Sequence, residues 1–137
     1  MKILAVQNRM GIGDMIIFLP FIEAIAKKFA SPVSILVKQN TKSSEILKNN
    51  SCIDKIIFLD RNDRTKEGRH FGFVGTLNLT SDIQKYNFDK VFIFNSSLRF
   101  RLIMKIAKIK DIYQYKLFDK KKTKCNKSSS RFFKKVN

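Results

Sequence analysis

The chain alternates between short apolar runs and segments in which apolar residues recur with helical spacing. Residues 2–7 form the first apolar run, which is long enough for a buried strand. In the segment that follows, apolar residues recur at i, i+3, i+4, i+7 and i+11, the pattern of an amphipathic helix: Phe18, Phe21, Ile22, Ile25 and Phe29. The same reasoning predicts further strands at 33–37, 56–59, 91–94 and 112–115, and further helices at 42–48, 77–86 and 98–109.

Strands separated by helix-length segments predict βαβ units, a parallel sheet and an α/β fold class. Right-handed crossovers place helices on both faces of such a sheet. Residues 60–75 contain three glycines without a clear period, which predicts a long loop. His70 lies within this loop, where we expect a mobile setting and assign it no role.

Length and charge narrow the class of protein further. The 137 residues suit one domain and are too few for a two-domain enzyme. The net charge of +17 indicates polyanionic partners, namely nucleic acid, anionic lipid or phosphorylated substrates. Residues 116–137 hold nine of the 28 basic residues and one of the 11 acidic ones, so close to half of the net charge lies there. We therefore expect a folded domain at 1–118 and a basic, disordered tail at 119–137.

The cysteines and the apolar runs indicate a cytoplasmic protein. Cys52 and Cys125 lie far apart and show neither a metal-binding spacing nor a disulfide framework, as is typical of a reducing compartment. The first apolar run breaks at Gln7, without the cleavage site of a signal peptide. No apolar stretch reaches the roughly 18 residues of a membrane span.

The loop after the first strand is the main candidate site. In an open parallel sheet, ligands bind beyond the carboxyl ends of the strands. Gly11 and Gly13 allow close approach of a ligand to the backbone, but Ile16 stands where a dinucleotide fingerprint has its third glycine. The carboxylate of Asp14 would also repel a pyrophosphate. Asp14 can act as a base or bind a hydroxyl; the alternative is that it only caps the following helix.

Three segments, taken in order, resemble a known family: Gly11-Ile12-Gly13-Asp14 with Leu19-Pro20, Asn49-Asn50-Ser51-Cys52-Ile53-Asp54-Lys55-Ile56-Ile57, and Tyr86-Asn87-Phe88-Asp89-Lys90-Val91. Residues 1–115 resemble the N-terminal half of the family 9 glycosyltransferases, the heptosyltransferases of lipopolysaccharide core assembly. The resemblance implies a Rossmann-like three-layer domain with a parallel sheet of about five strands, as in the N-terminal half of a GT-B fold. In that fold the N-terminal domain holds the acceptor, and the C-terminal domain binds a nucleotide-activated sugar such as ADP-heptose.

The resemblance also implies roles for particular residues. Asp14 would be the general base that deprotonates the acceptor hydroxyl. After the fourth strand, Ile93 stands where the family has an acid and Ser96 where it has glycine. No metal and no cofactor are implied. The acceptor-binding residues would be Arg9, Gly11, Gly13, Asn95, Ser96 and Arg99.

The expected partners follow from the absence of a donor-binding C-terminal domain in the sequence. A nucleotide-sugar donor would bind only with a second domain or a partner chain, so we expect a truncated and inactive transferase half. Its acceptor would be an anionic glycolipid, with peripheral contact to the inner face of the cytoplasmic membrane through basic residues. The alternative is a non-enzymatic basic α/β module that binds nucleic acid or other polyanions. Nucleic acid is disfavoured because most aromatic residues are phenylalanines at core-like positions and no RNA-binding motif is present.

Overall fold

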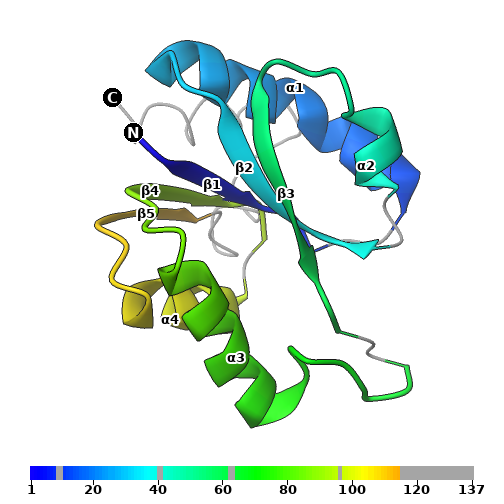
Figure 1. The fold of residues 1–137 in the computed structure, drawn as a ribbon, viewed down its shortest axis with the longest axis vertical. Coiled ribbons are helices and arrows are strands. Elements are labelled where there is room, and N and C mark those ends of the chain that lie inside the picture. Colours follow the sequence, from blue (N-terminus) through cyan, green and yellow to red (C-terminus); the bar gives the residue numbers. More distant parts are fainter. Residues whose placement is uncertain (9–10, 40–41, 62–63, 96, 115–137) are drawn as a thin grey trace, which may run out of the picture.

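The computed structural model describes residues 1–114 apart from 9–10, 40–41, 62–63 and 96. Five strands and four helices follow one another along these residues (Figure 1). The expected tail at 119–137 lies outside the described residues. The elements are β1 (Ile3–Val6), α1 (Ile12–Phe29), β2 (Val33–Lys38), α2 (Ser43–Ile46), β3 (Ile53–Leu59), α3 (Gly72–Gln84), β4 (Lys90–Ile93), α4 (Leu98–Ile106) and β5 (Asp111–Gln114).

The five strands form one parallel sheet in the order β3-β2-β1-β4-β5. Central β1 pairs with β2 on one side and β4 on the other, so that Ile3 is in register with both Val33 and Lys90. Helices α1 and α2 cover one face of the sheet, and α3 and α4 cover the other (Figure 1). The predicted α/β class, with a Rossmann-like parallel sheet of five strands, is confirmed.

The core has two apolar layers, one on each face of the sheet. All four residues of β1 are at most 1% exposed, which explains why this strand is a continuous apolar run. Ile3 and Ala5 pack in the layer beneath α1, whereas Leu4 and Val6 pack in the layer beneath α3 and α4. Since successive side chains of a strand point to opposite faces, β1 contributes equally to both layers.

Polar contacts fix the edge of the sheet at which the strands begin. The Lys2 backbone N–H donates to Asp89 Oδ2 at 2.8 Å, and Lys2 Nζ donates to the Tyr86 carbonyl at 3.1 Å. These bonds hold the start of β1 against the start of β4. Before β3, the Asn50 side chain donates to Glu23 of α1 at 2.9 Å, and this bond holds the start of β3 against α1. Segments that carried the family resemblance therefore stabilise the fold at this edge.

Two helices begin earlier than the apolar period predicts. Helix α1 begins at Ile12 rather than near Phe18, so Gly13 and Asp14 lie in its first turn. Helix α3 begins at Gly72, which corrects the loop predicted at 60–75. A loop was predicted for these residues because glycine destabilises isolated helices. Gly75 is nevertheless required in α3, since a Cβ there would lie 2.1 Å from the carbonyl carbon of His70.

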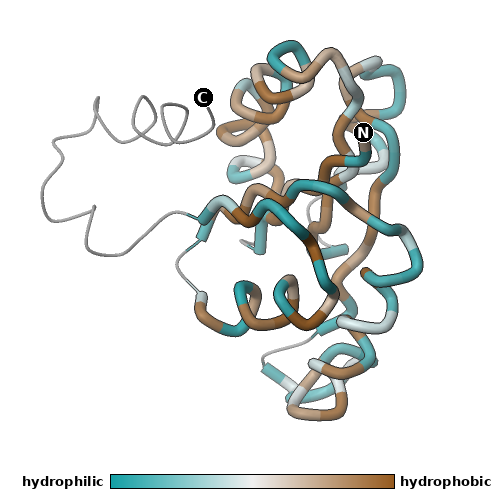
Figure 2. Tube along the Cα trace, turned by 90° about the vertical axis from the view of Figure 1, so that its left-hand side faces the viewer, coloured by the Kyte–Doolittle hydropathy of each residue, from teal (hydrophilic) through white to brown (hydrophobic). Residues whose placement is uncertain are grey.

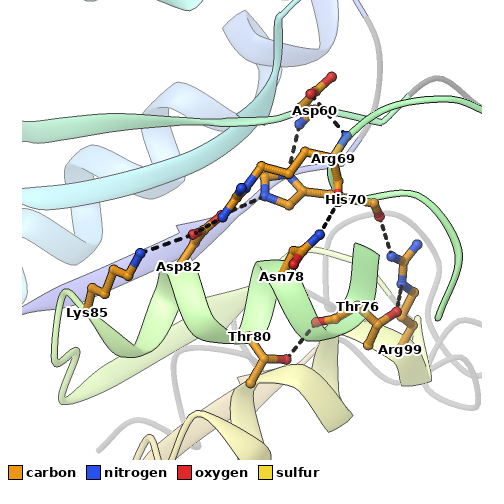
Figure 3. A network of polar contacts seen from close by, with 9 residues as sticks. All are labelled: Asp60, Arg69, His70, Thr76, Asn78, Thr80, Asp82, Lys85 and Arg99. Atoms are coloured by element: carbon orange, nitrogen blue, oxygen red, sulfur yellow. Dashed lines mark hydrogen bonds and ion pairs between the residues drawn. The ribbon is translucent and has the colours of Figure 1, made fainter. Parts of the chain in front are cut away.

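His70 lies in the connection between β3 and α3, as predicted, but it is a buried structural residue there. It is 4% exposed and bonded on both ring nitrogens (Figure 3). The Asp60 backbone N–H donates to Nδ1 at 3.0 Å, so Nδ1 must be the unprotonated nitrogen. Nε2 then carries the hydrogen and donates it to Asp82 Oδ2 at 2.9 Å. A neutral imidazole thus connects the end of β3 with α3.

Asp82 is the centre of this network. Arg69 donates to both of its carboxylate oxygens, from Nε at 3.1 Å and from Nη2 at 3.0 Å (Figure 3). The bonds from Arg69, and then from His70, lower the pKa of Asp82 from 3.8 to about 2 against the effect of burial, which raises it. Asp82 therefore stays ionised and holds residues 69–70 against α3.

The lowered pKa of Asp82 predicts acid sensitivity. A carboxyl with a depressed folded-state pKa contributes stability above its unfolded value, and this contribution is lost as the pH falls from about 4 towards 2. We expect Asp82→Asn to lower the free energy of unfolding at neutral pH by about 1–2 kcal/mol, since half-exposed Arg69 is partly screened. Denaturant unfolding at several pH values measures this. The difference from wild type should shrink towards pH 2; Glu67→Gln, at an exposed position of the same loop, is the control.

Replacing Gly75 tests the contact between α3 and His70. We expect Gly75→Ala to destabilise the protein by about 1–3 kcal/mol or more, because the added methyl group meets backbone atoms that cannot move aside cheaply. Gly13→Ala is the matched control: Gly13 is also helical, but a Cβ there would meet no atom within 4 Å. Thermal unfolding compares the two. Equal melting temperatures for both variants would contradict the close packing at Gly75.

Candidate functional site

The candidate site lies where the strand order reverses. From β1 the chain proceeds outward to β2 and β3, then crosses back to β4 on the other side of β1. The connections that follow β1 and β4 therefore diverge to opposite faces of the sheet. In open parallel sheets such a switch point, at the carboxyl ends of the strands, is where ligands bind. Here it brings together the segments after Val6 and after Ile93.

Asp14 occupies the first turn of α1 but does not cap it. The N-cap is Gly11, with φ of 106° and no side-chain cap bond, so the capping alternative for Asp14 is wrong. The Asp14 carboxylate is half-buried and makes no hydrogen bond or ion pair with any residue that the structure describes. Its oxygens are therefore available to a ligand.

Packing of α1 places Asp14 on the side of β4. Phe18, one helical turn after Asp14, shares its side of α1. The Phe18 ring stacks on Phe94, with ring centroids 5.3 Å apart. Because Asn95 follows Phe94 directly, the first turn of α1 and the turn after β4 are neighbours. The first turn of α1, which contains Asp14, and the turn that contains Asn95 therefore lie at the same edge of the sheet, although the two residues are 81 positions apart in the sequence.

Asn95 is held rigidly but keeps one polar group free. Its Oδ1 accepts the Ser97 backbone N–H at 2.9 Å, closing a tight turn. Gln114 of β5 stabilises this turn, since its Nε2 donates to the carbonyls of Asn95 at 3.2 Å and of Ser97 at 2.7 Å. The Nδ2 group of Asn95 is buried and has no hydrogen-bond partner among the described residues. Asn95 can therefore donate to a bound molecule without rearrangement of its turn.

Gln7 is a site residue that the sequence analysis missed. Its backbone N–H extends the parallel ladder by donating to the Leu36 carbonyl at 3.0 Å, so the alternation of β1 directs its side chain beneath α1. Gln7 is 2% exposed, yet neither Nε2 nor Oε1 has a hydrogen-bond partner in the described part of the chain. An unpaired buried amide costs about 1–3 kcal/mol, so it needs an explanation. The only signal in the sequence is that Gln7 is the first polar residue after a buried run.

Gly11 and Gly13 have open space beside them. A Cβ built on Gly11 or Gly13 would meet no atom within 4 Å. Gly11 needs to be glycine for its positive φ, which L side chains rarely adopt. Open space beside the first turn of α1 allows a ligand to approach the Asp14 carboxylate and the backbone N–H groups there.

The remaining predicted residues have different settings. Arg99 donates from Nε to Thr76 Oγ1 at 3.1 Å and from Nη2 to the His70 carbonyl at 2.6 Å (Figure 3). It therefore connects the start of α4 to α3 and to the network around His70. Arg9 and Ser96 lie outside the described residues. Within the described ranges, no group of three His, Cys, Asp or Glu side chains could hold a metal ion.

Comparisons with known proteins identify the fold. No protein-family model matches the chain, and no curated protein matches it significantly. A solved glycosyl transferase of family 9 from Veillonella parvula is similar with a TM-score of 0.70 and 17% identity, over 99% of this chain and 41% of that one. The E. coli ADP-heptose lipopolysaccharide heptosyltransferase II is similar with a TM-score of 0.60 and 14% identity, over 83% and 30% of the two chains.

A third similar structure is not a glycosyltransferase. The C-terminal domain of the PF1911 hydrogenase from Pyrococcus furiosus matches with a TM-score of 0.53 and 13% identity, over 83% of this chain and 90% of that domain. Identities this low show a shared fold alone, here a Rossmann-like fold that matches glycosyltransferases of the GT-B type. The chain spans less than half the length of both transferases. The fold therefore does not determine the activity, which depends on the residues of the site.

The unpaired amide of Gln7 predicts that a less polar residue improves stability. We expect Gln7→Leu to raise the free energy of unfolding by about 1 kcal/mol, because leucine is of similar size and leaves no unpaired amide. Thermal unfolding measures this, with Gln39→Leu at an exposed position as the control. A substantial loss of stability in Gln7→Leu would show that the amide is bonded within the folded protein rather than reserved for a bound molecule.

Proposed function

We propose that this chain is the acceptor-binding half of a glycosyltransferase of the lipopolysaccharide heptosyltransferase type. It would transfer a sugar from a nucleotide-activated donor, such as ADP-heptose, to a glycolipid acceptor. The observation that carries the proposal is the Asp14 carboxylate at the switch point, which no described residue engages, at the same edge of the sheet as the amide groups of Gln7 and Asn95 that lack a partner among the described residues. The similarity in fold to two transferases supports it.

The polar groups of the site suit a sugar better than a phosphate. The Gln7 amide offers both a donor and an acceptor, which matches hydroxyl groups because these also donate and accept. A phosphate only accepts, and it would be repelled by the carboxylate of Asp14. Asn95 adds a second donor. A polyhydroxylated ligand therefore fits these groups best.

In the proposed reaction Asp14 is the general base. Its carboxylate takes the proton of an acceptor hydroxyl while the hydroxyl oxygen attacks the anomeric carbon of the donor sugar. The bond from that carbon to the nucleotide diphosphate breaks, the diphosphate leaves with the electron pair, and the configuration inverts. Gln7 and Asn95 orient the acceptor through its neighbouring hydroxyls. Arg9 and Ser96 complete the acceptor site in this proposal, and Arg99 holds α4 in place beside it.

The donor must be bound by protein outside this domain. The chain spans 41% and 30% of the two transferases it is similar to, so a second domain or a partner chain would supply the nucleotide-sugar site. We place the reaction in the cytoplasm, where nucleotide sugars are made. On this proposal residues 1–114 by themselves bind acceptor but not donor.

Replacing Asp14 tests the base. The chain is combined with a donor-binding half, either one encoded beside it or the complementary segment of the Veillonella parvula transferase. Transfer from ADP-heptose to a lipopolysaccharide core acceptor is then measured. We expect Asp14→Asn to lower the turnover rate by about 10²–10⁴-fold, because the amide cannot accept the proton. Acceptor affinity and melting temperature should change little.

Asp54→Asn is the control, since Asp54 is an exposed acid at the start of β3, at the edge of the sheet opposite the switch point. Retained turnover in Asp14→Asn would overturn the assignment of the base. No transfer by the wild-type chain beside a half that binds ADP-heptose, together with salt-sensitive retention of nucleic acid, would favour a polyanion-binding module instead.

A further inference from the structure

Helices α3 and α4 lie side by side and run in the same direction. At their starts Arg99 Nε donates to Thr76 Oγ1, and at their ends Gln84 Nε2 donates to the Ile106 carbonyl at 3.2 Å. Both helices pack on the same face of the sheet (Figure 1). Their outer surfaces therefore form one continuous face of the molecule.

This outer face is apolar. Phe73 and Leu77 are one turn apart on α3, and Leu98, Leu102 and Ile106 are one turn apart on α4. Their exposed fractions range from 46% to 79%, with Phe73 and Leu98 the most exposed. We call these five residues the α3–α4 apolar face. Scattered exposed hydrophobic residues need no explanation, but a contiguous set on two neighbouring helices indicates an interaction surface.

The apolar face is separate from the core of the domain. Helix α4 buries Phe100, Ile103 and Met104 against the sheet, on its opposite side. Hydrophobic positions recur along the helices as well as in the sheet (Figure 2). The stability of the fold therefore does not require apolar residues on the outer side of α4, and their presence there calls for a contact outside the domain.

The charged residues of α4 that border this face are all basic. Arg101 and Lys105 lie on the flank of the helix that points away from α3, and Lys108 follows one turn later. Helix α4 contains no acidic residue. On α3 the one acid, Asp82, is bonded to Arg69 and His70 on the flank remote from α4. The apolar face is thus bordered by cations without compensating carboxylates.

We propose that the α3–α4 apolar face docks on the surface of an anionic lipid bilayer. The five apolar side chains would enter the boundary between headgroups and acyl chains, while Arg101, Lys105 and Lys108 bind lipid phosphates. A protein partner would need a matching acidic and apolar surface, and nucleic acid would leave the apolar side chains in water. Among the described residues, none of the helices has both the length and the hydrophobicity that a membrane span requires.

Docking would also orient the candidate site. Helices α3 and α4 begin at the carboxyl edge of the sheet, where Asp14 and Asn95 lie, so the docked domain presents that edge near the bilayer. A glycolipid acceptor could then reach the site without leaving the membrane. This last step rests on the proposed function, but bilayer binding itself does not.

Vesicle co-sedimentation of the full chain tests the proposal without any transfer reaction. The probes are vesicles of phosphatidylcholine alone and of phosphatidylcholine with phosphatidylglycerol, at low and high salt. We expect binding to the anionic vesicles, and on the order of tenfold weaker binding for Leu98→Ser with Leu102→Ser. Ile16→Ser with Ile17→Ser is the matched control, since these residues are also exposed on a helix but on the other face of the sheet.

A second pair of variants tests the charges. Lys105→Glu should weaken binding to the anionic vesicles several-fold and should have little effect with neutral vesicles, whereas Lys48→Glu, exposed after α2, should bind as wild type. Melting temperatures of all variants show whether each is folded.

Three results would overturn the proposal. The first is equal binding by the Leu98/Leu102 and Ile16/Ile17 variants. The second is loss of binding only when the basic residues of 116–137 are replaced by glutamine, which would assign binding to that segment. The third is a wild-type dimer that dissociates in the Leu98/Leu102 variant and binds no vesicles, which would assign the face to a second copy. None of these results bears on the role of Asp14, so the two proposals can fail separately.

Discussion

The parallel direction of all five strands is the constraint on which the rest of this structure depends. Each connection must return from the carboxyl edge of the sheet to the amino edge, so helices cover both faces and β1 is buried from both sides. The same constraint places the starts of α1, α3 and α4 at one edge. Placement of β4 beside β1 then creates the switch point, and the stacking of Phe18 on Phe94 holds the start of α1 beside the end of β4.

The two edges of the sheet differ in how their polar groups are satisfied. At the amino edge, Asp89 and Asn50 are bonded to other parts of the fold. At the carboxyl edge, Gln7 and Asn95 keep unpaired amide groups. Buried polar groups are rarely left without partners, so this difference marks the carboxyl edge as the place where a ligand would complete the bonding. The segments that resemble the transferase family therefore divide into those that hold the fold and those that form the site.

The fold is compatible with more than one chemistry, since transferases and a hydrogenase domain share it. The network around His70 shows how this chain adapts the fold. It fixes residues 69–70 to α3, and Arg99 extends the connection to α4 through the His70 carbonyl. The two helices that carry the apolar face are thus held together by polar contacts at their starts.

Periodicity alone was sufficient to predict the α/β class, the parallel sheet and the location of most strands, because the 2.0- and 3.6-residue repeats reflect which side chains are buried. It did not fix the start of α1, which begins at Ile12, before the first residue of the apolar period. It could not predict that α3 begins at Gly72, because that start depends on the close packing of Gly75 against His70. Nor could it predict the burial of Gln7 or the packing of Phe18 on Phe94. These depend on the strand order and on the packing of α1 over β4, which are properties of the tertiary structure and not of any local stretch of sequence.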